Sequence, residues 1–189
     1  MNEKEAIEKA VLELQSKNVI LCPSDTIYGL SCDATSEEAV EKIIQLKNRP
    51  STKSFIVLVN STRMINQCIK DMPEVAWDLI DLAEKPLTLV LEGTNYVAKN
   101  ARNEDGTIGI RMVKSGSCFE LLKRFNKPII STSPNVSGEP TPESFEKIAK
   151  EIKENVSYVF PNKMATGLSS SPSRIVKLNA DGEVLILRK

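Results

Sequence analysis

The segment that decides the fold is LCPSDTIYGLSCDATSEEAVEKIIQLKNRPSTK, residues 21–53. It continues a short apolar run, 19–22, that is typical of a buried strand. A polar loop follows, with side chains from Ser24, Asp25, Thr26 and Tyr28. We expect the chain to turn at Gly29 and enter a helix, whose end carries the cations Lys47, Arg49 and Lys53. A polar loop after a strand, followed by cations, indicates a site for an anionic ligand.

Composition favours one globular domain over residues 1–189, since 189 residues with 41% hydrophobic content can bury a proper core. Twenty-five basic and 25 acidic residues give zero net charge. No overall field therefore draws the chain to nucleic acid, although a local basic patch remains compatible with this balance. The N-terminus MNEKEAIEKA is charged, and no apolar run approaches the roughly 18 residues of a membrane span. We expect a cytoplasmic protein without membrane contact.

The chain has no histidine. That excludes Ser-His-Asp and Cys-His catalysis, and it removes the commonest general base. The cysteines are scattered along the chain without a C-x-x-C pair, at Cys22, Cys32, Cys68 and Cys118. This spacing predicts reduced thiols and no metal site built by the protein. Chemistry must then depend on positioning, fixed charge, hydroxyls, lysine, aspartate or a metal ion that arrives with the substrate.

Apolar periodicity predicts alternating helices and strands. Helices are predicted at 3–17, 35–49, 63–69, 73–84, 118–125 and 141–152, and strands at 19–22, 55–59, 87–91, 107–113, 128–131, 156–160, 174–178 and 183–188. A capping box is expected at Thr35 and Glu38, and Thr141 with Pro142 is expected to begin the last helix. The pattern indicates an α/β domain with a mixed sheet, closed by a hairpin at 179–182.

A second polar loop, 131–138, follows a predicted strand. Within seven positions it gathers Ser131, Thr132, Ser133, Asn135 and Ser137. Hydroxyls, an amide and turn-forming backbone N–H groups suit a phosphate cradle. The same residues are also typical of a polar turn that caps its own backbone. Neither G-x-x-x-x-G-K-[ST] nor G-x-G-x-x-G occurs, so a nucleotide site would be of another type.

Two further cations are candidates for a site. Arg111 shares one strand face with Thr107 and Gly109, and a charge on a strand face usually has a specific role. Arg188 ends an apolar strand beside the C-terminus. Each cation taken alone is also compatible with a solvated surface charge.

These motifs together resemble the YrdC/Sua5 family over about residues 5–188. The resemblance is carried in order by Pro23-Ser24-Asp25-Thr26-Ile27-Tyr28-Gly29-Leu30 with Lys47-x-Arg49-Pro50, then 86–91, Gly109-Ile110-Arg111, 131–138 and Pro172-Ser173-x-Ile175-Val176. It implies a single YrdC-like domain with a twisted mixed sheet, flanking helices and a large basic cavity. It also implies synthesis of L-threonylcarbamoyl-AMP and pyrophosphate from L-threonine, bicarbonate or CO2, and ATP with Mg2+. The product would supply the machinery that makes the tRNA modification t6A37.

The resemblance also implies site residues. The expected threonine-binding residues are Thr26, Arg111, Ser131 and Ser173. The expected ATP-binding residues are Lys47, Arg49, Lys53, Thr107, Ser133, Asn135, Thr141 and Arg188. Lys47 and Arg49 are also the expected catalytic cations. Leu58 departs from the pattern, because some relatives have a threonine-contacting histidine there.

Two alternatives use the same residues differently. A non-catalytic module could hold tRNA or double-stranded RNA in the basic cavity, or an enzyme could bind RNA weakly, but zero net charge and 5% aromatics disfavour RNA readout. Carbamoyl-phosphate-dependent transfer, as in larger hydrogenase-maturation proteins, is disfavoured because this chain has no zinc-finger cysteines. The base that deprotonates threonine is not assigned, with Asp25 and Asp33 as candidates.

Overall fold

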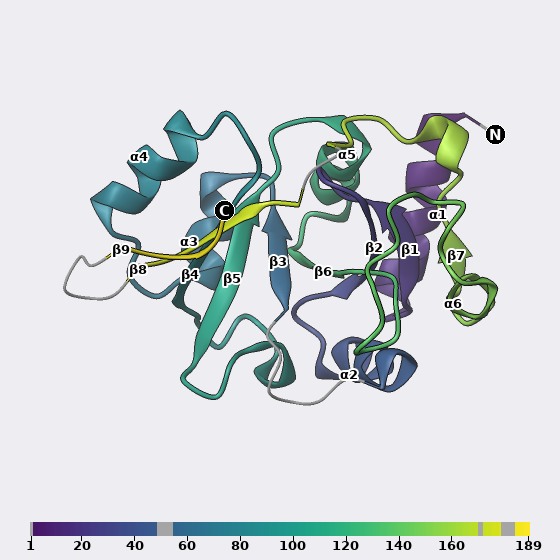
Figure 1. Ribbon diagram of the computed structural model, residues 1–189, viewed down its shortest axis with the longest axis horizontal. Helices are drawn as coiled ribbons and strands as arrows, with labels where there is room; N and C mark the ends of the chain where they lie inside the picture. Colours follow the sequence, from purple (N-terminus) through teal and green to yellow (C-terminus); the bar gives the residue numbers. More distant parts are fainter. Residues whose placement is uncertain (1, 49–54, 170–171, 179–183) are drawn as a thin grey trace.

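The computed structural model describes residues 2–48, 55–169, 172–178 and 184–189. Its centre is a nine-stranded mixed sheet with the strand order β7-β1-β2-β6-β3-β5-β4-β8-β9. Figure 1 shows β3 near the middle, with β6, β2 and β1 to one side and β5, β4 and β8 to the other. The predicted α/β class with a mixed, twisted sheet is therefore confirmed.

Most strands lie where the apolar runs predicted them. Their bounds are β1 Ile20–Pro23, β2 Tyr28–Asp33, β3 Ile56–Val59, β4 Leu87–Glu92, β5 Thr107–Met112, β6 Ile129–Thr132, β7 Tyr158–Val159, β8 Arg174–Leu178 and β9 Val184–Arg188. The parallel pairs are β1–β7, β3–β5 and β4–β8, and the other neighbours pair antiparallel. The predicted hairpin is confirmed in its two strands, β8 and β9, while its turn lies outside the described residues.

The predicted turn at Gly29 is wrong, whereas the helix predicted to follow at 35–49 is present as α2, Glu37–Lys47. Residues 28–33 form β2, which pairs antiparallel with β1 and is buried along its whole length. The turn between the two strands occupies 24–27, where the Ser24 N–H donates to the Ile27 carbonyl at 3.1 Å. Gly29 therefore lies within a strand rather than at the turn. A glycine in a strand interior often marks a close approach of another segment.

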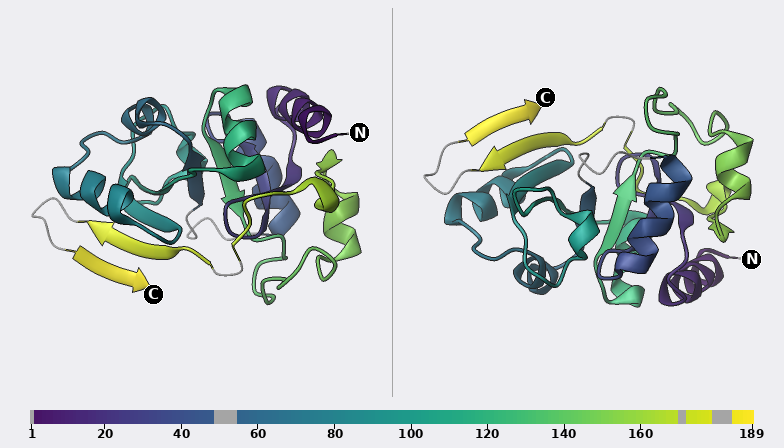
Figure 2. Two further views of the ribbon diagram at one scale, coloured as in Figure 1. Left: turned by 90° about the horizontal axis from the view of Figure 1, so that it is seen from above. Right: turned by 90° about the horizontal axis from the view of Figure 1, so that it is seen from below.

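The helices are α1 Glu3–Gln15, α2 Glu37–Lys47, α3 Thr62–Cys68, α4 Glu74–Leu82, α5 Gly116–Phe125 and α6 Lys150–Glu154, with 3-10 turns η1 Lys99–Ala101 and η2 Asn162–Met164. Asn2 and Glu5 form a complete capping box at the start of α1. The N-cap of α2 is Ser36 rather than Thr35, because the Thr35 backbone and hydroxyl both donate to Asp33. Figure 2 shows α1 and α5 on one side of the molecule and the C-terminal hairpin on the other.

The predicted helix at 141–152 is largely wrong, because only α6, Lys150–Glu154, is helical there. The preceding residues 141–149 form bends and turns. The Phe145 ring packs on Tyr28, with ring centroids 4.7 Å apart, and Ile148 is buried. These tertiary contacts prevail over local helix propensity. Among the described residues, no helix is long and apolar enough to cross a membrane.

Candidate active site

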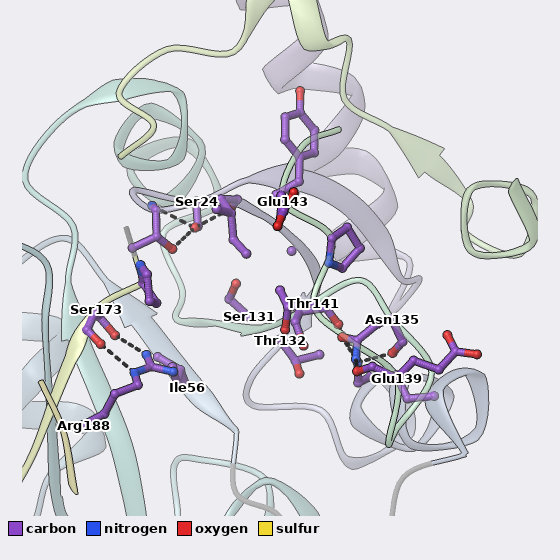
Figure 3. A pocket seen from close by; sticks show the side chains of 18 of the residues that line it. Ser24, Ile56, Ser131, Thr132, Asn135, Glu139, Thr141, Glu143, Ser173 and Arg188 are labelled. Atoms are coloured by element: carbon purple, nitrogen blue, oxygen red, sulfur yellow. Dashed lines mark hydrogen bonds between the residues drawn. The ribbon is translucent and has the colours of Figure 1, made fainter. Parts of the chain in front are cut away.

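A cavity of about 810 Å³ opens where the β1–β2 turn, the loop after β6 and the C-terminal hairpin converge. Its lining includes Ser24, Thr26, Gly29, Lys47, Ile56, Arg111, Ser131, Thr132, Ser133, Asn135, Ser137, Glu139, Thr141, Pro142, Glu143, Ser173 and Arg188. Figure 3 shows Ser173 and Arg188 on one side, Asn135 and Thr141 on the other, and Ser131 between them. A ligand in the cavity would therefore contact residues that are distant in the sequence.

The β1–β2 turn holds Thr26 at the cavity wall through hydroxyl contacts. The Ser24 hydroxyl donates to the Ile27 carbonyl at 2.6 Å and accepts from the Thr26 N–H at 3.0 Å. The Ser24 and Thr26 hydroxyl oxygens are 2.9 Å apart, and both side chains are buried. A turn closed by its own side chains in this way has little freedom to change shape.

Gly29 lets β2 and β6 bring their polar residues together. A Cβ atom at this position would lie 2.5 Å from Ser131 Oγ and 3.2 Å from the Thr132 carbonyl oxygen. Ser131 pairs with Ser31 across the β2–β6 ladder and also lines the cavity. The absence of a side chain at Gly29 is therefore what gives the Ser131 hydroxyl its place.

Lys47 joins the end of α2 to the loop after β6. Its side chain is buried, and Nζ donates to the carbonyls of Ser133 and Asn135, each at 2.5 Å. Its own carbonyl accepts from the Ser137 N–H at 2.9 Å. Asn48 then ends the helix in the left-handed region, with φ of 47°. A lysine ammonium is thus fixed inside the cavity wall by backbone carbonyls, where its charge is only partly screened.

The loop after β6 both caps itself and lines the cavity. The Asn135 side-chain amide donates to the carbonyls of Val136 and Glu139, at 3.1 and 2.7 Å. This agrees with the interpretation of a self-capping polar turn. Because Ser131, Ser133 and Asn135 also line the cavity, the same loop can present polar groups to a ligand.

Arg188 is tied to the strand pair β4–β8 through Ser173. Its Nε donates to the Ser173 carbonyl at 2.8 Å and its Nη2 to the Ser173 hydroxyl at 3.1 Å, as Figure 3 shows. The Ser173 and Thr88 hydroxyls are 2.8 Å apart. Partial burial, and then the positive charge of Arg111, lower the pKa of Arg188 below its usual value. Two arginines that repel each other beside one cavity favour an anion between them.

Arg111 projects from the middle of β5 and is almost fully buried, with 3% of its surface exposed. Its Nη2 lies 2.8 Å from Asp25 Oδ1 in an ion pair. Sequence reasoning gave Asp25 no contact with Arg111. The sequence did contain a reason to look for a partner of Arg111, because a buried arginine on a strand usually has a counter-ion.

The cavity brings together most of the predicted site residues: Thr26, Lys47, Arg111, Ser131, Ser133, Asn135, Thr141, Ser173 and Arg188. Thr107 does not line it, because its hydroxyl donates to Asp105 at 2.6 Å and accepts from Asn103 at 2.8 Å, at the far end of β5. Arg49 and Lys53 lie outside the described residues. Leu58 is fully buried in the core, so no threonine contact is expected there.

The cavity lining also contains two carboxylates that sequence reasoning did not single out, Glu139 and Glu143. Glu143 forms an ion pair with Lys147, four residues further along the chain, and this contact lowers the pKa of Glu143. Among the described residues, no three histidine, cysteine or acidic side chains gather in a way that could hold a metal ion. Asp33, one of the two bases considered from the sequence, is not in the lining and pairs with Lys127 at 2.8 Å.

The four cysteines are free and buried, which removes them from the chemistry of the site. Burial raises the pKa of Cys22 to about 11 and that of Cys68 to about 12, and it raises the pKa of Cys32 and Cys118 as well. The thiolate is the reactive form, and it accumulates only as pH rises toward the pKa.

We therefore expect the folded protein to resist a thiol-reactive disulfide reagent at pH 8, where roughly one Cys22 thiol in a thousand would be ionised. The denatured chain should react at all four thiols. The measurement is the absorbance of the released chromophore with and without denaturant. Rapid stoichiometric labelling of the folded protein would contradict the burial of these residues.

The arrangement is suited to aligning charged substrates rather than to forming a covalent intermediate. Three cations face the cavity among the described residues, Lys47, Arg111 and Arg188, together with several hydroxyls. No histidine is present to activate a serine. Fixed cations and hydroxyls in a partly enclosed cavity can orient a carboxylate and neutralise phosphate oxygens, which is the main requirement of adenylyl transfer.

The chain is similar over most of its length to proteins of one family. The sequence model of the family described as "Telomere recombination", Sua5/YciO/YrdC, matches residues 13–189. A protein of Hahella chejuensis named threonylcarbamoyl-AMP synthase is 31% identical over 170 residues, which cover 89% of this chain and 91% of that protein. One of Pseudoalteromonas translucida with the same name is 26% identical over 178 residues, covering 93% and 94%.

Solved structures of similar proteins belong to the same family. P. abyssi Sua5 complexed with L-threonine superposes with a TM-score of 0.88 at 26% identity, covering 100% of this chain but 54% of that one. This chain therefore spans about half of the Sua5 protein. E. coli YciO shares the fold with a TM-score of 0.82 at 23% identity, covering 97% of this chain and 88% of that one. The chain belongs to the Sua5/YciO/YrdC family.

Proposed function

We propose that this protein is a threonylcarbamoyl-AMP synthase, a nucleotidyltransferase that joins L-threonine, bicarbonate or CO2, and the adenylyl group of ATP. The observation that carries the proposal is one cavity in which a buried arginine, a buried lysine and the hydroxyl-rich loop after β6 converge. Its volume of about 810 Å³ lies within the usual range of small-molecule sites. The names of the relatives and the threonine-bound Sua5 structure support the choice of substrates.

The threonine end of the site is formed by Thr26, Arg111, Ser131 and Ser173. In this proposal, Arg111 binds the α-carboxylate, since a guanidinium presents paired donors that match a carboxylate. The Ser131 and Thr26 hydroxyls lie on the β2–β6 side and orient the rest of the amino acid. Ser173 is held by Arg188 and Thr88, so its hydroxyl has a fixed position.

The ATP end is formed by Lys47, Ser133, Asn135, Thr141 and Arg188, with Arg49 and Lys53 as further proposed contacts. Lys47 places a positive charge behind the loop after β6, and Arg188 provides a second one across the cavity. Mg2+ would enter with ATP, held chiefly by phosphate oxygens, and the lining carboxylates Glu139 and Glu143 are the residues that would supply protein ligands. Its contribution would be to neutralise charge on the triphosphate.

The proposed chemistry balances without a protein nucleophile. The ammonium of threonine and bicarbonate give an N-carboxylate, water and one proton. An oxygen of the N-carboxylate then forms a bond to the α-phosphorus of ATP while the bond to pyrophosphate breaks. The chain's part is to hold both reactants in line and to stabilise the charge that spreads over the phosphate oxygens.

The alternative of a non-catalytic RNA-binding module is not favoured, because the similar relatives carry the name of an enzyme. In our proposal the protein acts in the cytoplasm and passes its product to the machinery that transfers the threonylcarbamoyl group to tRNA. Weak RNA binding would be an addition to this activity, and its loss with added salt would reveal phosphate contacts.

The proposal is tested by following pyrophosphate release from ATP with Mg2+ and bicarbonate, with each amino acid added in turn. We expect release that depends on both threonine and bicarbonate, together with a product that has the mass of threonylcarbamoyl-AMP. Release that is independent of threonine, or no turnover with steep salt-dependent RNA binding, would refute it.

Gly29→Ala offers a local test of the threonine end. The new methyl group would lie 2.5 Å from Ser131 Oγ, so the hydroxyl must rotate away from its place at the cavity. We expect the KM for threonine to rise about tenfold with little change in the KM for ATP, since one misplaced contact costs about 1.4 kcal/mol. Steady-state kinetics measure both constants.

Ser131→Ala is the matched control for this prediction. If the effect passes through the Ser131 hydroxyl, adding Gly29→Ala to Ser131→Ala should change the threonine KM little further. Two fully additive effects would show that Gly29→Ala acts by another route.

A further inference from the structure

We infer that Asp25 is a positioning residue that holds Arg111 in the orientation that receives the substrate carboxylate. This inference rests on the proposed function, because it assigns a residue that acts through the proposed carboxylate-binding group. Asp25 precedes Thr26 in the β1–β2 turn, and its Oδ1 lies 2.8 Å from Arg111 Nη2. The two side chains are 12% and 4% exposed, so the attraction is weakly screened.

Asp25 lies behind the guanidinium as seen from the substrate. Arg111 lines the cavity of about 810 Å³, whereas Asp25 lines a second cavity of about 380 Å³, together with Lys114 and Leu168. The carboxylate is therefore placed to hold Arg111 without occupying the substrate's own volume. This separation distinguishes a positioning role from direct contact with the reactants.

Charge attraction rather than a hydrogen bond holds the pair. Neither Asp25 Oδ1 nor Arg111 Nε makes a hydrogen bond with any residue that the structure describes. A buried guanidinium nitrogen without such a bond is unusual in a folded protein. The ion pair thus fixes the position of the guanidinium while leaving donor capacity for a substrate carboxylate.

Asp25 also opposes the repulsion between the two arginines of the cavity. Arg111 lowers the pKa of Arg188, so the two positive charges act on one another. Without a counter-ion, Arg111 would be driven away from Arg188 and out of the geometry that serves the substrate. Asp25 is the acidic residue paired with Arg111 in the described part of the chain.

The backbone of Asp25 is anchored, so its carboxylate has a defined place. Its carbonyl accepts from the Ser169 N–H at 3.2 Å. The segment that contains Ser169 is held in turn at Gly167, where an added Cβ would lie 2.7 Å from the Gly116 Cα. The segment 167–169 therefore holds the backbone of Asp25, while Arg111 is held in β5.

The test compares wild type, Asp25→Asn, Arg111→Ala and the double variant by kinetics and by calorimetric threonine binding. We expect Asp25→Asn to raise the KM and Kd for threonine about tenfold or more, as loss of a supporting partner typically does, with the KM for ATP within about twofold. In the Arg111→Ala background it should cause no further loss of threonine affinity. Asp25→Glu, which keeps the charge, should recover part of the loss.

Asp33→Asn is the matched control, because Asp33 is also buried and has one basic partner, Lys127, at 2.8 Å, but does not line the cavity. It should leave both KM values unchanged. An unchanged or lower KM for threonine in Asp25→Asn would overturn this inference but not the proposed function. An equal rise in the KM for ATP would do the same. If the wild-type protein neither binds threonine nor turns it over, both the proposed function and this inference are overturned. If Asp25→Asn does not fold, Asp25→Ser takes its place as the variant without the charge, and an unchanged threonine KM in Asp25→Ser overturns the inference.

Discussion

Replacing Lys47 with methionine is expected to lower kcat/KM by about 100-fold or more, because the proposed ATP end of the site would lose a fixed positive charge. The side chain is 1% exposed, and its ammonium holds the carbonyls of Ser133 and Asn135 in place. Without it, the loop after β6 loses the side-chain hydrogen bonds to α2 and keeps the backbone contact of the Ser137 N–H with the residue 47 carbonyl. The measurement is the rate of threonine-dependent pyrophosphate release over a range of ATP concentrations.

The same substitution should lower the free energy of unfolding by about 1–3 kcal/mol, because buried carbonyls are left without their donor. Chemical denaturation measures this change. Lys42→Met is the matched control on the same helix, since Lys42 is 41% exposed and pairs with Glu38. It should alter activity by less than about twofold. Comparable losses in both variants would show that α2 as a whole, rather than the Lys47 ammonium, is responsible.

Local patterns predicted those parts of the molecule whose structure is set by nearby residues. The apolar runs of β3, β4, β5 and β6 and the capping box of α1 were readable because their period and caps lie within a few residues. The segment 28–33 was not readable as a strand. Its residues Tyr28 and Gly29 follow turn-forming residues, and its strand character comes from pairing with β1 and β6.

The site was predictable in its members but not in its contacts. The resemblance to a family placed Lys47 near the loop after β6, but it did not indicate that the ammonium is bonded to carbonyls 86 and 88 residues away. The ion pair of Asp25 with Arg111 is also non-local, and no period or spacing encodes it. Non-local contacts also determine the structure of segment 141–149, where packing on Tyr28 prevails over a well-formed local helix signal.

Arg111→Ala is expected to have the largest effect on threonine recognition. Loss of the proposed bidentate, charge-assisted contact with the threonine carboxylate should raise the KM for threonine by about 100-fold, while the KM for ATP changes far less. The substitution also leaves Asp25 as a buried carboxylate without its cation, so the free energy of unfolding should fall by about 3–5 kcal/mol. Steady-state kinetics and denaturant titration measure the two effects.

The two effects should separate in second variants. Adding Asp25→Asn to Arg111→Ala removes the unpaired charge, so stability should recover in part while threonine affinity does not. Lys127→Ala is the control for the loss of a cation beside a buried aspartate, because it leaves Asp33 without its basic partner far from the cavity lining. It should reduce stability without changing the threonine KM. If Arg111→Ala behaved like Lys127→Ala, with weakened folding and normal threonine dependence, Arg111 would be a structural cation, and the carboxylate of threonine would have to be bound by Arg188.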